Sequence, residues 1–255
     1  MPDVWEPAQY QRFRKERARP FHDLLALVEP RPSLRAADLG CGTGDLTLLL
    51  HRTLGAQETV GFDNSAAMLA RAPREAGLRY TQQEIEEFAP ALPFDLVFSN
   101  AALHWVPDHP ALLRRLTAAL RPGGQVAVQM PMNDEHPSHV TAHELARTPE
   151  FRALLGGFER RPPLLPPSRY AELLQKLGYA RQHVRLYVYG HLLESREQVI
   201  EWVRGTLLTD YQKRLAPPDW ERFLQSYREL LLPGLPDERP YFYTYPRLFL
   251  WGALP

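Results

Sequence analysis

The chain has 255 residues, of which 44% are hydrophobic and 24% charged, and its thirty basic side chains balance its thirty acidic ones. This composition excludes an intrinsically disordered protein, and the zero net charge excludes a sequence-wide attraction to nucleic acid or to an anionic membrane. The length is ample for one large domain with a buried core and a sizeable insertion.

Cysteine use and the N-terminus indicate the compartment. Cys41 is the one cysteine, which excludes an internal disulfide and favours a reducing environment. The N-terminal stretch is charged and unlike a secretory signal, and no run approaches the roughly 20 apolar residues of a membrane span. We expect a cytoplasmic protein, a monomer or small homo-oligomer, whose partner is a small molecule and neither nucleic acid nor a membrane.

Arginine is strongly preferred over lysine. All but three of the thirty basic residues are arginine, the lysines being Lys15, Lys176 and Lys213. Genomic base composition is the ordinary explanation. The alternative is that some arginines present planar forks to carboxylates or phosphates, which lysine cannot do.

Short apolar runs alternate with helical patterns over residues 34–130. We expect strands at 36–40, 58–63, 78–82, 94–100 and 123–130, and helices at 45–52, 65–74 and 110–120. Strands that alternate with helices predict a parallel sheet with right-handed crossovers, and therefore a doubly wound α/β domain.

The pattern changes after residue 130. Prolines punctuate residues 131–167, a helix is expected at 168–177, and alternating residues predict strands at 183–190 and 245–252. The intervening stretch, 192–243, has the pattern of two or three helices. We expect a helical insertion, acting as a lid, before the last strand.

A glycine-rich loop follows the first strand. Gly40, Gly42 and Gly44 alternate with other residues and open a helix, an arrangement that lets backbone N–H groups approach a ligand at a helix N-terminus. Asp63 stands nineteen residues after Gly44, at the end of the second strand, where a carboxylate can accept hydrogen bonds from both hydroxyls of a ribose. A nucleoside-containing cofactor is implied.

Two other ligands of glycine loops fit less well. A dinucleotide loop needs a third glycine where Thr47 stands, and a phosphate-binding loop needs Gly-Lys-Ser/Thr, which is absent. Asp38, two residues before the loop, would repel a pyrophosphate but suits a cofactor that carries an ammonium group. These features favour S-adenosylmethionine.

The motifs D-L-G-C-G-T-G, G-F-D and S-N-A-A-L-H-W resemble the class I methyltransferases. Segments along the whole chain, including W-E-P-A-Q-Y near the start and Y-P-R-L-F near the end, are similar in order and spacing to the trans-aconitate 2-methyltransferase family. The resemblance implies a Rossmann-like, mostly parallel sheet of seven strands, with residues 1–30 as a helical cover, 31–130 as the cofactor-binding half and 192–243 as the lid of a single domain.

The resemblance also implies which residues bind the cofactor. The glycines would line its amino-acid end beside Asp38, Asp63 would hold the ribose, Glu84 would face the adenine amino group, and Met68 would pack on the adenine. The full set is Asp38, Gly40, Gly42, Gly44, Asp63, Asn64, Met68, Glu84, Ile85, Asn100 and Ala101.

The acceptor implied by the resemblance is a small polycarboxylic acid. A carboxylate is ionised at neutral pH and needs no general base, and arginine forks could hold its other carboxylates. The candidates are Tyr10, Arg17, Arg19, Trp105, Tyr245 and Arg247. Each of them also has an ordinary alternative role, at the surface for the arginines and in packing for the aromatic residues.

Other interpretations stay open. His104 could be a general base for a hydroxyl or amine acceptor, and Trp202, Tyr211, Tyr227, Tyr241 and Tyr243 could form an aromatic lid over an apolar metabolite. The chain could also hold the cofactor without activity, as a sensor. His136, His139 and His143 have a spacing that could hold zinc, but we expect no metal and assign them to a pocket wall or a helix start.

Overall fold

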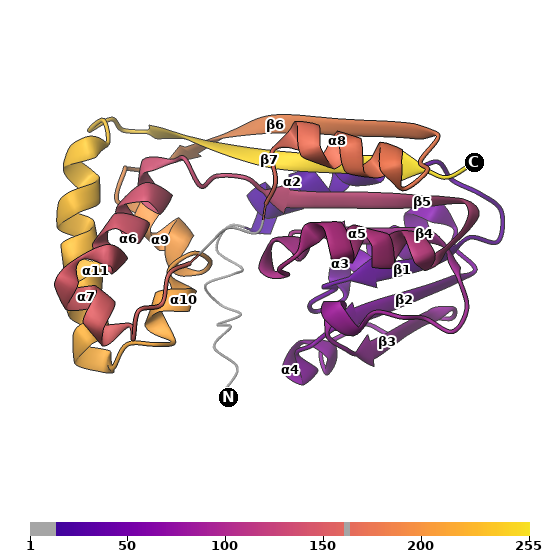
Figure 1. The fold of residues 1–255 in the computed structure, drawn as a ribbon, viewed down its shortest axis with the longest axis horizontal. Helices are drawn as coiled ribbons and strands as arrows, with labels where there is room; N and C mark the ends of the chain where they lie inside the picture. Colours follow the sequence, from indigo (N-terminus) through magenta and orange to yellow (C-terminus); the bar gives the residue numbers. More distant parts are fainter. Residues whose placement is uncertain (1–13, 161–163) are drawn as a thin grey trace. The chain divides into compact units, whose positions relative to one another are not determined.

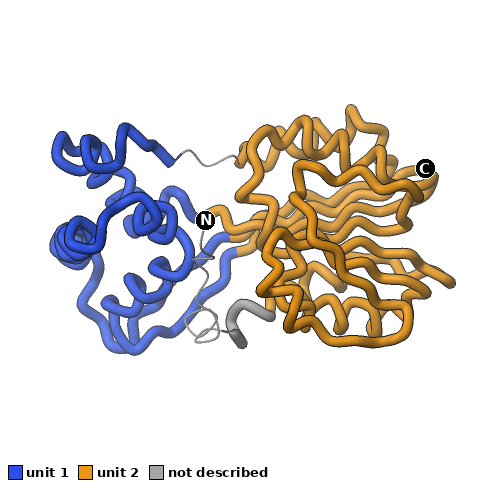
Figure 2. The backbone as a smooth tube through the Cα atoms, turned by 90° about the horizontal axis from the view of Figure 1, so that it is seen from below, with its two compact units in different colours: residues 1–16, 133–162, 188–246 blue, residues 17–132, 163–187, 247–255 orange. Residues whose placement is uncertain are grey.

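The computed structural model describes residues 14–160 and 164–255, with side chains from residue 19 onward in the first of these segments. The chain falls into two compact units (Figure 2). The sheet unit comprises residues 17–132, 163–187 and 247–255, and the helical unit comprises residues 1–16, 133–162 and 188–246.

A seven-stranded sheet has the order β3-β2-β1-β4-β5-β7-β6 (Figure 1). Its strands are β1 (Arg35–Leu39), β2 (Glu58–Asp63), β3 (Leu78–Gln82), β4 (Phe94–Asn100), β5 (Leu120–Pro131), β6 (Arg181–Leu193) and β7 (Tyr241–Ala253). Strands β1 to β5 pair in parallel, whereas β7 is antiparallel to β5. The predicted doubly wound, mostly parallel sheet is confirmed, and the carboxyl ends of β1, β2, β4 and β5 meet at one edge.

The sheet unit carries helices on both faces of the sheet. They are α2 (Arg14–Leu25), α3 (Asp45–Leu54), α4 (Ala66–Leu69), α5 (His109–Ala118) and α8 (Pro167–Lys176). On one face, Val128 of β5 shares a core with Leu116 of α5 and Leu174 of α8. On the other, the ring of Phe21 in α2 lies 5.3 Å from that of Phe98 in β4. Burying a phenylalanine side chain contributes about 2–3 kcal/mol, so these contacts hold the strand ends in place.

The helical unit has a core of its own. Its helices are α6 (Pro137–Arg147), α7 (Pro149–Leu154), α9 (Gln198–Arg204), α10 (Thr209–Gln212) and α11 (Pro217–Leu231). The hydroxyl of Tyr227 donates to the carbonyl of Ser138 at 2.8 Å, and Asn133 Nδ2 donates to the hydroxyl of Tyr243 at 3.1 Å. Large aromatic side chains of this unit, among them Trp202, Tyr211 and Phe223, are buried in its core.

The structure corrects several predicted boundaries. The helix expected at 65–74 ends at Leu69, and Pro73 prevents a helix from running on to residue 74, because proline disfavours helical geometry in the residue before it. The last strand begins at Tyr241, four residues before the prediction, and β6 runs on to Leu193. Two of the prolines in residues 131–167 start α6 and α7, at the first helical position, where a missing N–H costs nothing.

The helical insertion before the last strand is confirmed, with α9, α10 and α11 inside it. Its role as a lid, and the role of residues 1–30 as a cover, stay predictions. In the described part of the chain, no helix is long and apolar enough to cross a membrane.

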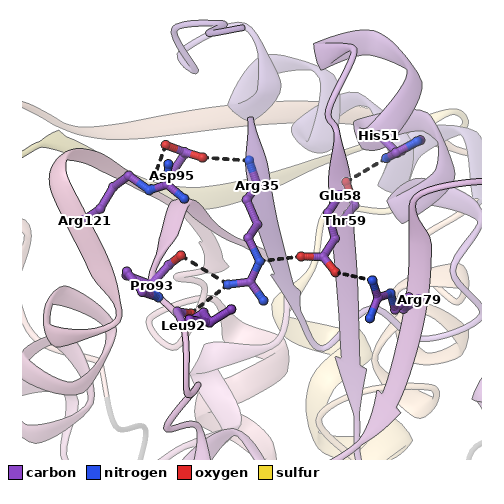
Figure 3. A network of polar contacts seen from close by, with 9 residues as sticks. All are labelled: Arg35, His51, Glu58, Thr59, Arg79, Leu92, Pro93, Asp95 and Arg121. Atoms are coloured by element: carbon purple, nitrogen blue, oxygen red, sulfur yellow. Dashed lines mark hydrogen bonds and ion pairs between the residues drawn. The ribbon is translucent and has the colours of Figure 1, made fainter. Parts of the chain in front are cut away.

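An arginine network joins the amino ends of β1 and β2 (Figure 3). Arg35 Nη1 donates to the carbonyls of Leu92 at 2.7 Å and Pro93 at 3.1 Å, and Arg35 Nε pairs with Glu58. The guanidinium also lies 4.0 Å from the centre of the Phe94 ring. These contacts fix the segment that leads into β4, at the edge opposite the glycine loop.

Replacing Arg35 by alanine should lower the free energy of unfolding by about 2 kcal/mol, because charge-assisted hydrogen bonds to three partners are lost. The matched control is Arg52→Ala, which removes an ion pair with Glu75. Because the Arg52 side chain is 63% exposed, this change should leave the free energy of unfolding nearly unchanged. Urea unfolding of both variants measures the difference. Equal losses would contradict a stabilising role for the network.

Candidate functional site

The glycine loop connects β1 to α3 in a conformation that requires glycine. Gly40, Gly42 and Gly44 have φ angles of 73°, 57° and 73°. A Cβ on Gly40 would lie 2.1 Å from Ala102 Cβ, and one on Gly44 would lie 2.6 Å from the hydroxyl oxygen of Tyr80. The loop is thus pressed between the segment after β4 on one side and β3 on the other.

Gly42 differs from its two neighbours. Apart from Gly42 itself and the residues on either side of it in the chain, no described atom lies within 4 Å of the place where its Cβ would be. The loop therefore leaves open space at its middle glycine, next to the N-terminus of α3. Backbone N–H groups of such a loop, together with the helix terminus, are suited to a polar ligand.

Asp63 ties the loop to the end of β2. Its Oδ2 accepts from the N–H of Gly42 at 2.8 Å, and its Oδ1 accepts from the N–H of Ser65 at 2.9 Å. A carboxylate has about four acceptor positions, so two remain for the hydroxyls of a ligand. The Asp63 side chain can therefore fix the conformation of the loop and also accept hydrogen bonds from a ligand bound by the loop.

Asp38 is a buried carboxyl group at the end of β1. It is 4% exposed, and its Oδ2 accepts from Thr47 Oγ1 at 2.7 Å. Burial raises the pKa of Asp38 to about 7, with the nearby charge of Asp63 adding to the effect and the Thr47 hydrogen bond opposing it. A cationic group bound beside it would restore the ionised form.

The predicted adenine-side residues lie along the ends of β2 and β3. Asn64 Nδ2 donates to the carboxylate of Glu84 at 3.1 Å, and both side chains are exposed. Ile85 begins the short helix η1 (Ile85–Glu87) and packs partly against the core, while Met68 in α4 is half-buried. Glu84 thus has a partner in the chain and is open to solvent.

The end of β4 presents an unsatisfied acceptor. Asn100 Oδ1 is buried and has no hydrogen-bond partner among the described residues. Ala101 follows with a φ of 56°, a left-handed conformation that costs roughly 1–3 kcal/mol in a residue other than glycine. Its N–H donates to the carbonyl of Gln129 at 2.8 Å, which holds the turn. Strain and an orphaned polar atom at one strand end are typical of a binding site.

The predicted acceptor-binding residues are found in different places. Arg247 in β7 is 5% exposed, and its Nη1 donates to Gln129 Oε1 at 3.3 Å. Trp105 is half-buried in η2 (Leu103–Trp105), with its ring 4.7 Å from that of His104. Arg19 is exposed on α2. Tyr10 and the side chain of Arg17 lie outside the described residues.

Tyr245 belongs to the helical unit and packs in its core. Its ring lies 5.6 Å from that of Trp202 and 5.7 Å from that of Tyr243. The aromatic residues considered for a lid are buried in the same core. They are Trp202, Tyr211, Tyr227, Tyr241 and Tyr243.

The three clustered histidines make hydrogen bonds within the helical unit. His136 caps α6, its Nδ1 accepting from the N–H of Ser138 at 3.1 Å, and His143 Nδ1 lies 2.9 Å from the Tyr211 hydroxyl. Burial lowers the pKa of His139 to about 3 and that of His143 to about 4, so these rings are neutral at pH 7. Among the described residues, no group of three candidate ligands could hold a metal ion.

Comparison with known proteins identifies the family. Residues 10–184 match the model of a methyltransferase domain. A trans-aconitate 2-methyltransferase of Deinococcus radiodurans is 43% identical, over 99% of each chain. The chain belongs to the trans-aconitate 2-methyltransferase family. It is an S-adenosylmethionine-dependent methyltransferase.

Solved structures support the fold. The YcgJ protein of Bacillus subtilis has a TM-score of 0.59 at 17% identity, with 92% of this chain and 98% of that chain covered. A Haemonchus contortus phosphoethanolamine N-methyltransferase in complex with S-adenosylhomocysteine has a TM-score of 0.56 at 18% identity, covering 93% of this chain and 52% of that one.

The residues of the loop fit S-adenosylmethionine. Open space lies beside Gly42, the buried carboxyl of Asp38 suits an ammonium group, and Asp63 has acceptor positions left for ribose hydroxyls. The buried Oδ1 of Asn100 offers a further acceptor at the neighbouring strand end. When bound, the cofactor supplies an electrophilic methyl group, and these are the residues that would bind and orient it.

Three contributors to the site were not singled out from the sequence. Tyr80 packs on Gly44 and donates to its carbonyl at 3.3 Å, Ala102 packs on Gly40, and Gln129 accepts from Arg247. Gln129 is a polar residue inside a strongly apolar strand, but Gln125 has the same pattern, so this signal alone does not single it out. The roles of Tyr80 and Ala102 depend on contacts between distant segments, which leave no local pattern.

Gly40→Ala should abolish binding of S-adenosylhomocysteine, because the new methyl group collides with Ala102 Cβ. The double variant Gly40→Ala/Ala102→Gly removes the colliding atom and should recover part of the affinity. Titration calorimetry measures both, with Gly156→Ala as a control of similar backbone strain in the helical unit. A double variant no better than the single one would contradict the proposed contact.

Affinity for S-adenosylhomocysteine should rise with pH. Because the pKa of Asp38 is about 7 in the ligand-free protein, binding an ammonium group beside it must release a proton below that pH. The affinity should therefore increase roughly five- to tenfold from pH 6 to pH 7.5 and then level off. Asp38→Asn should remove this dependence, and an unchanged pH profile in that variant would contradict the role of Asp38.

Proposed function

We propose that the chain transfers the methyl group of S-adenosylmethionine to a carboxylate of a small polycarboxylic acid, with trans-aconitate as the acceptor. The observation that carries this proposal is the buried guanidinium of Arg247 at the carboxyl edge of the sheet. The names of the relatives, which match over nearly the whole chain, support the same acceptor.

The position of Arg247 follows from the strand register. Arg247 pairs with Pro131 at the end of β5, and two residues earlier in β5 Gln129 pairs with Asn100 in β4. Arg247 therefore lies at the same edge as Asn100. A guanidinium binds a carboxylate with two parallel hydrogen bonds, and burial strengthens such a charge-assisted pair. This arrangement supports an anionic acceptor.

Methyl transfer to a carboxylate needs alignment more than proton transfer. The acceptor oxygen is already ionised at neutral pH, so no side chain has to remove a proton. Holding the two reactants in line and excluding water can lower the barrier by roughly 7–11 kcal/mol. In this proposal Arg247 holds a carboxylate that does not react, and half-buried Trp105 provides an apolar wall. His104 has a role as base only if the acceptor is a hydroxyl or an amine.

The remaining assignments belong to the same proposal. Arg17, Arg19 and Tyr10 precede or lie on α2 and would contribute to the acceptor site from the N-terminal segment.

A cytoplasmic location agrees with the single cysteine, Cys41, whose thiol pKa is raised by burial so that it stays protonated.

Incubation with methyl-labelled cofactor and a panel of organic acids tests the proposal. The expected product is an alkali-labile methyl ester formed from polycarboxylates. Arg247→Lys keeps the charge but loses the fork, and should raise the KM for trans-aconitate about tenfold or more. Arg185→Lys, at an exposed position in β6, is the control and should change nothing. Methylation of hydroxyl acceptors alone, or cofactor binding without any turnover, would contradict the proposal.

A further inference from the structure

Two glutamines on β5 differ in how their amide groups are satisfied. Gln125 and Gln129 lie four residues apart, on the same face of the strand, and both are fully buried. Gln125 Oε1 accepts from the N–H of Glu29 at 2.9 Å and from Trp251 Nε1 at 3.0 Å, and its Nε2 donates to the carbonyl of Glu29 at 2.8 Å. Gln125 is therefore a complete structural link between β5, β7 and the segment after α2.

Only the oxygen of the Gln129 side-chain amide has a hydrogen-bond partner among the described residues. Its Oε1 accepts from Arg247 Nη1 at 3.3 Å, but its Nε2 has no hydrogen-bond partner among the described residues. A buried donor without a partner costs about 1–3 kcal/mol. Such a group in a native protein calls for an explanation, and a bound ligand is one.

The surroundings of Gln129 favour a ligand. Asn100, its register partner in β4, carries the buried acceptor Oδ1, which also has no described partner. The two amides are therefore not bonded to each other although their strands are adjacent. The orphaned donor and the orphaned acceptor both lie at the carboxyl edge of the sheet, the donor on β5, next to the strand of Arg247, and the acceptor one strand further away on β4.

The hydrogen-bond donors at this edge of the sheet indicate an anionic ligand. Gln129 Nε2 and the guanidinium of Arg247 are donors, and Gln129 Oε1 keeps the guanidinium in place by accepting one of its N–H groups. Two such donors on neighbouring strands match the oxygens of a carboxylate, and the neutral amide adds selectivity without a second positive charge.

We propose that Gln129 binds the methyl acceptor, its Nε2 donating to an oxygen of the carboxylate that Arg247 holds. This assignment rests on the proposed function and adds a specificity-determining residue to it. The alternative carboxylate is that of the cofactor's amino-acid end. Because the cofactor can be bound without the acceptor, the two can be measured separately.

Titration calorimetry of the whole protein provides the test. The first titration measures S-adenosylhomocysteine alone, and the second measures trans-aconitate added to the protein saturated with S-adenosylhomocysteine, so that no methyl transfer is required. Gln129→Met removes the donor at nearly constant volume. Gln129→Glu keeps an acceptor for Arg247 but places a negative charge where the ligand carboxylate would lie.

Gln129→Met should weaken trans-aconitate binding about tenfold, and Gln129→Glu by more, while the affinity for S-adenosylhomocysteine stays within about twofold. The matched control is Gln125→Met, which should lower the melting temperature by about 5 °C through lost hydrogen bonds and leave acceptor binding unchanged. An analogue of the acid that lacks the bound carboxylate should bind the wild type and Gln129→Met equally.

Three results would overturn the assignment. Unchanged trans-aconitate binding in Gln129→Met would remove Gln129 from the acceptor site while leaving the proposed function intact. Weakened S-adenosylhomocysteine binding with normal acceptor binding would assign the residue to the cofactor. A wild-type protein that binds no polycarboxylate would overturn both this assignment and the proposed acceptor.

Discussion

The hydrogen bonds between the end of β2 and the glycine loop are the constraint on which the site depends. Asp63 accepts from the N–H of Gly42 and from that of Ser65, and the carbonyl of Phe62 accepts from the N–H groups of Gly40 and Cys41. Three left-handed glycines would otherwise leave the loop with many conformations, and glycine loses the most freedom on folding. Asp63 holds the loop in one of these conformations, in which the N-terminus of α3 would face a bound cofactor.

Arginine has two roles in this structure, although the net charge of the chain is zero. At the amino ends of the strands, Arg35 and its neighbours bind carboxylates and carbonyls of the protein itself, and they stabilise the sheet. At the carboxyl edge, Arg247 is buried against a glutamine whose amide donor lacks a described partner. Only the second use bears on the acceptor.

The sequence predicted the fold where local patterns are strong. The apolar runs of β1, β2, β4 and β5, and the glycines after β1, were sufficient to predict these strands and the glycine loop that follows β1. The predicted end of α4 was wrong, and α6 and α7, which begin at prolines, were not predicted as elements. In a sequence, a proline usually indicates that a helix is interrupted, although in the first turn of a helix proline is favourable.

Contacts between distant segments could not be predicted in the same way. That Ala102 fits against Gly40, or that Tyr80 covers Gly44, depends on the packing of β3 and β4 around the loop. The half-satisfied amide of Gln129 likewise becomes visible only when its neighbours are in place, because Gln125 has the same pattern in the sequence and is fully bonded.

The most direct test of the central claim is the affinity of Asp63 variants for S-adenosylhomocysteine, measured by titration calorimetry with unfolding curves recorded in parallel. Asp63→Asn keeps one acceptor oxygen and should bind about tenfold more weakly, whereas Asp63→Ala should lose about a hundredfold or more, since both the loop and the ribose lose their partner. An Asp63→Ala protein that stays folded and binds as tightly as the wild type would contradict the account.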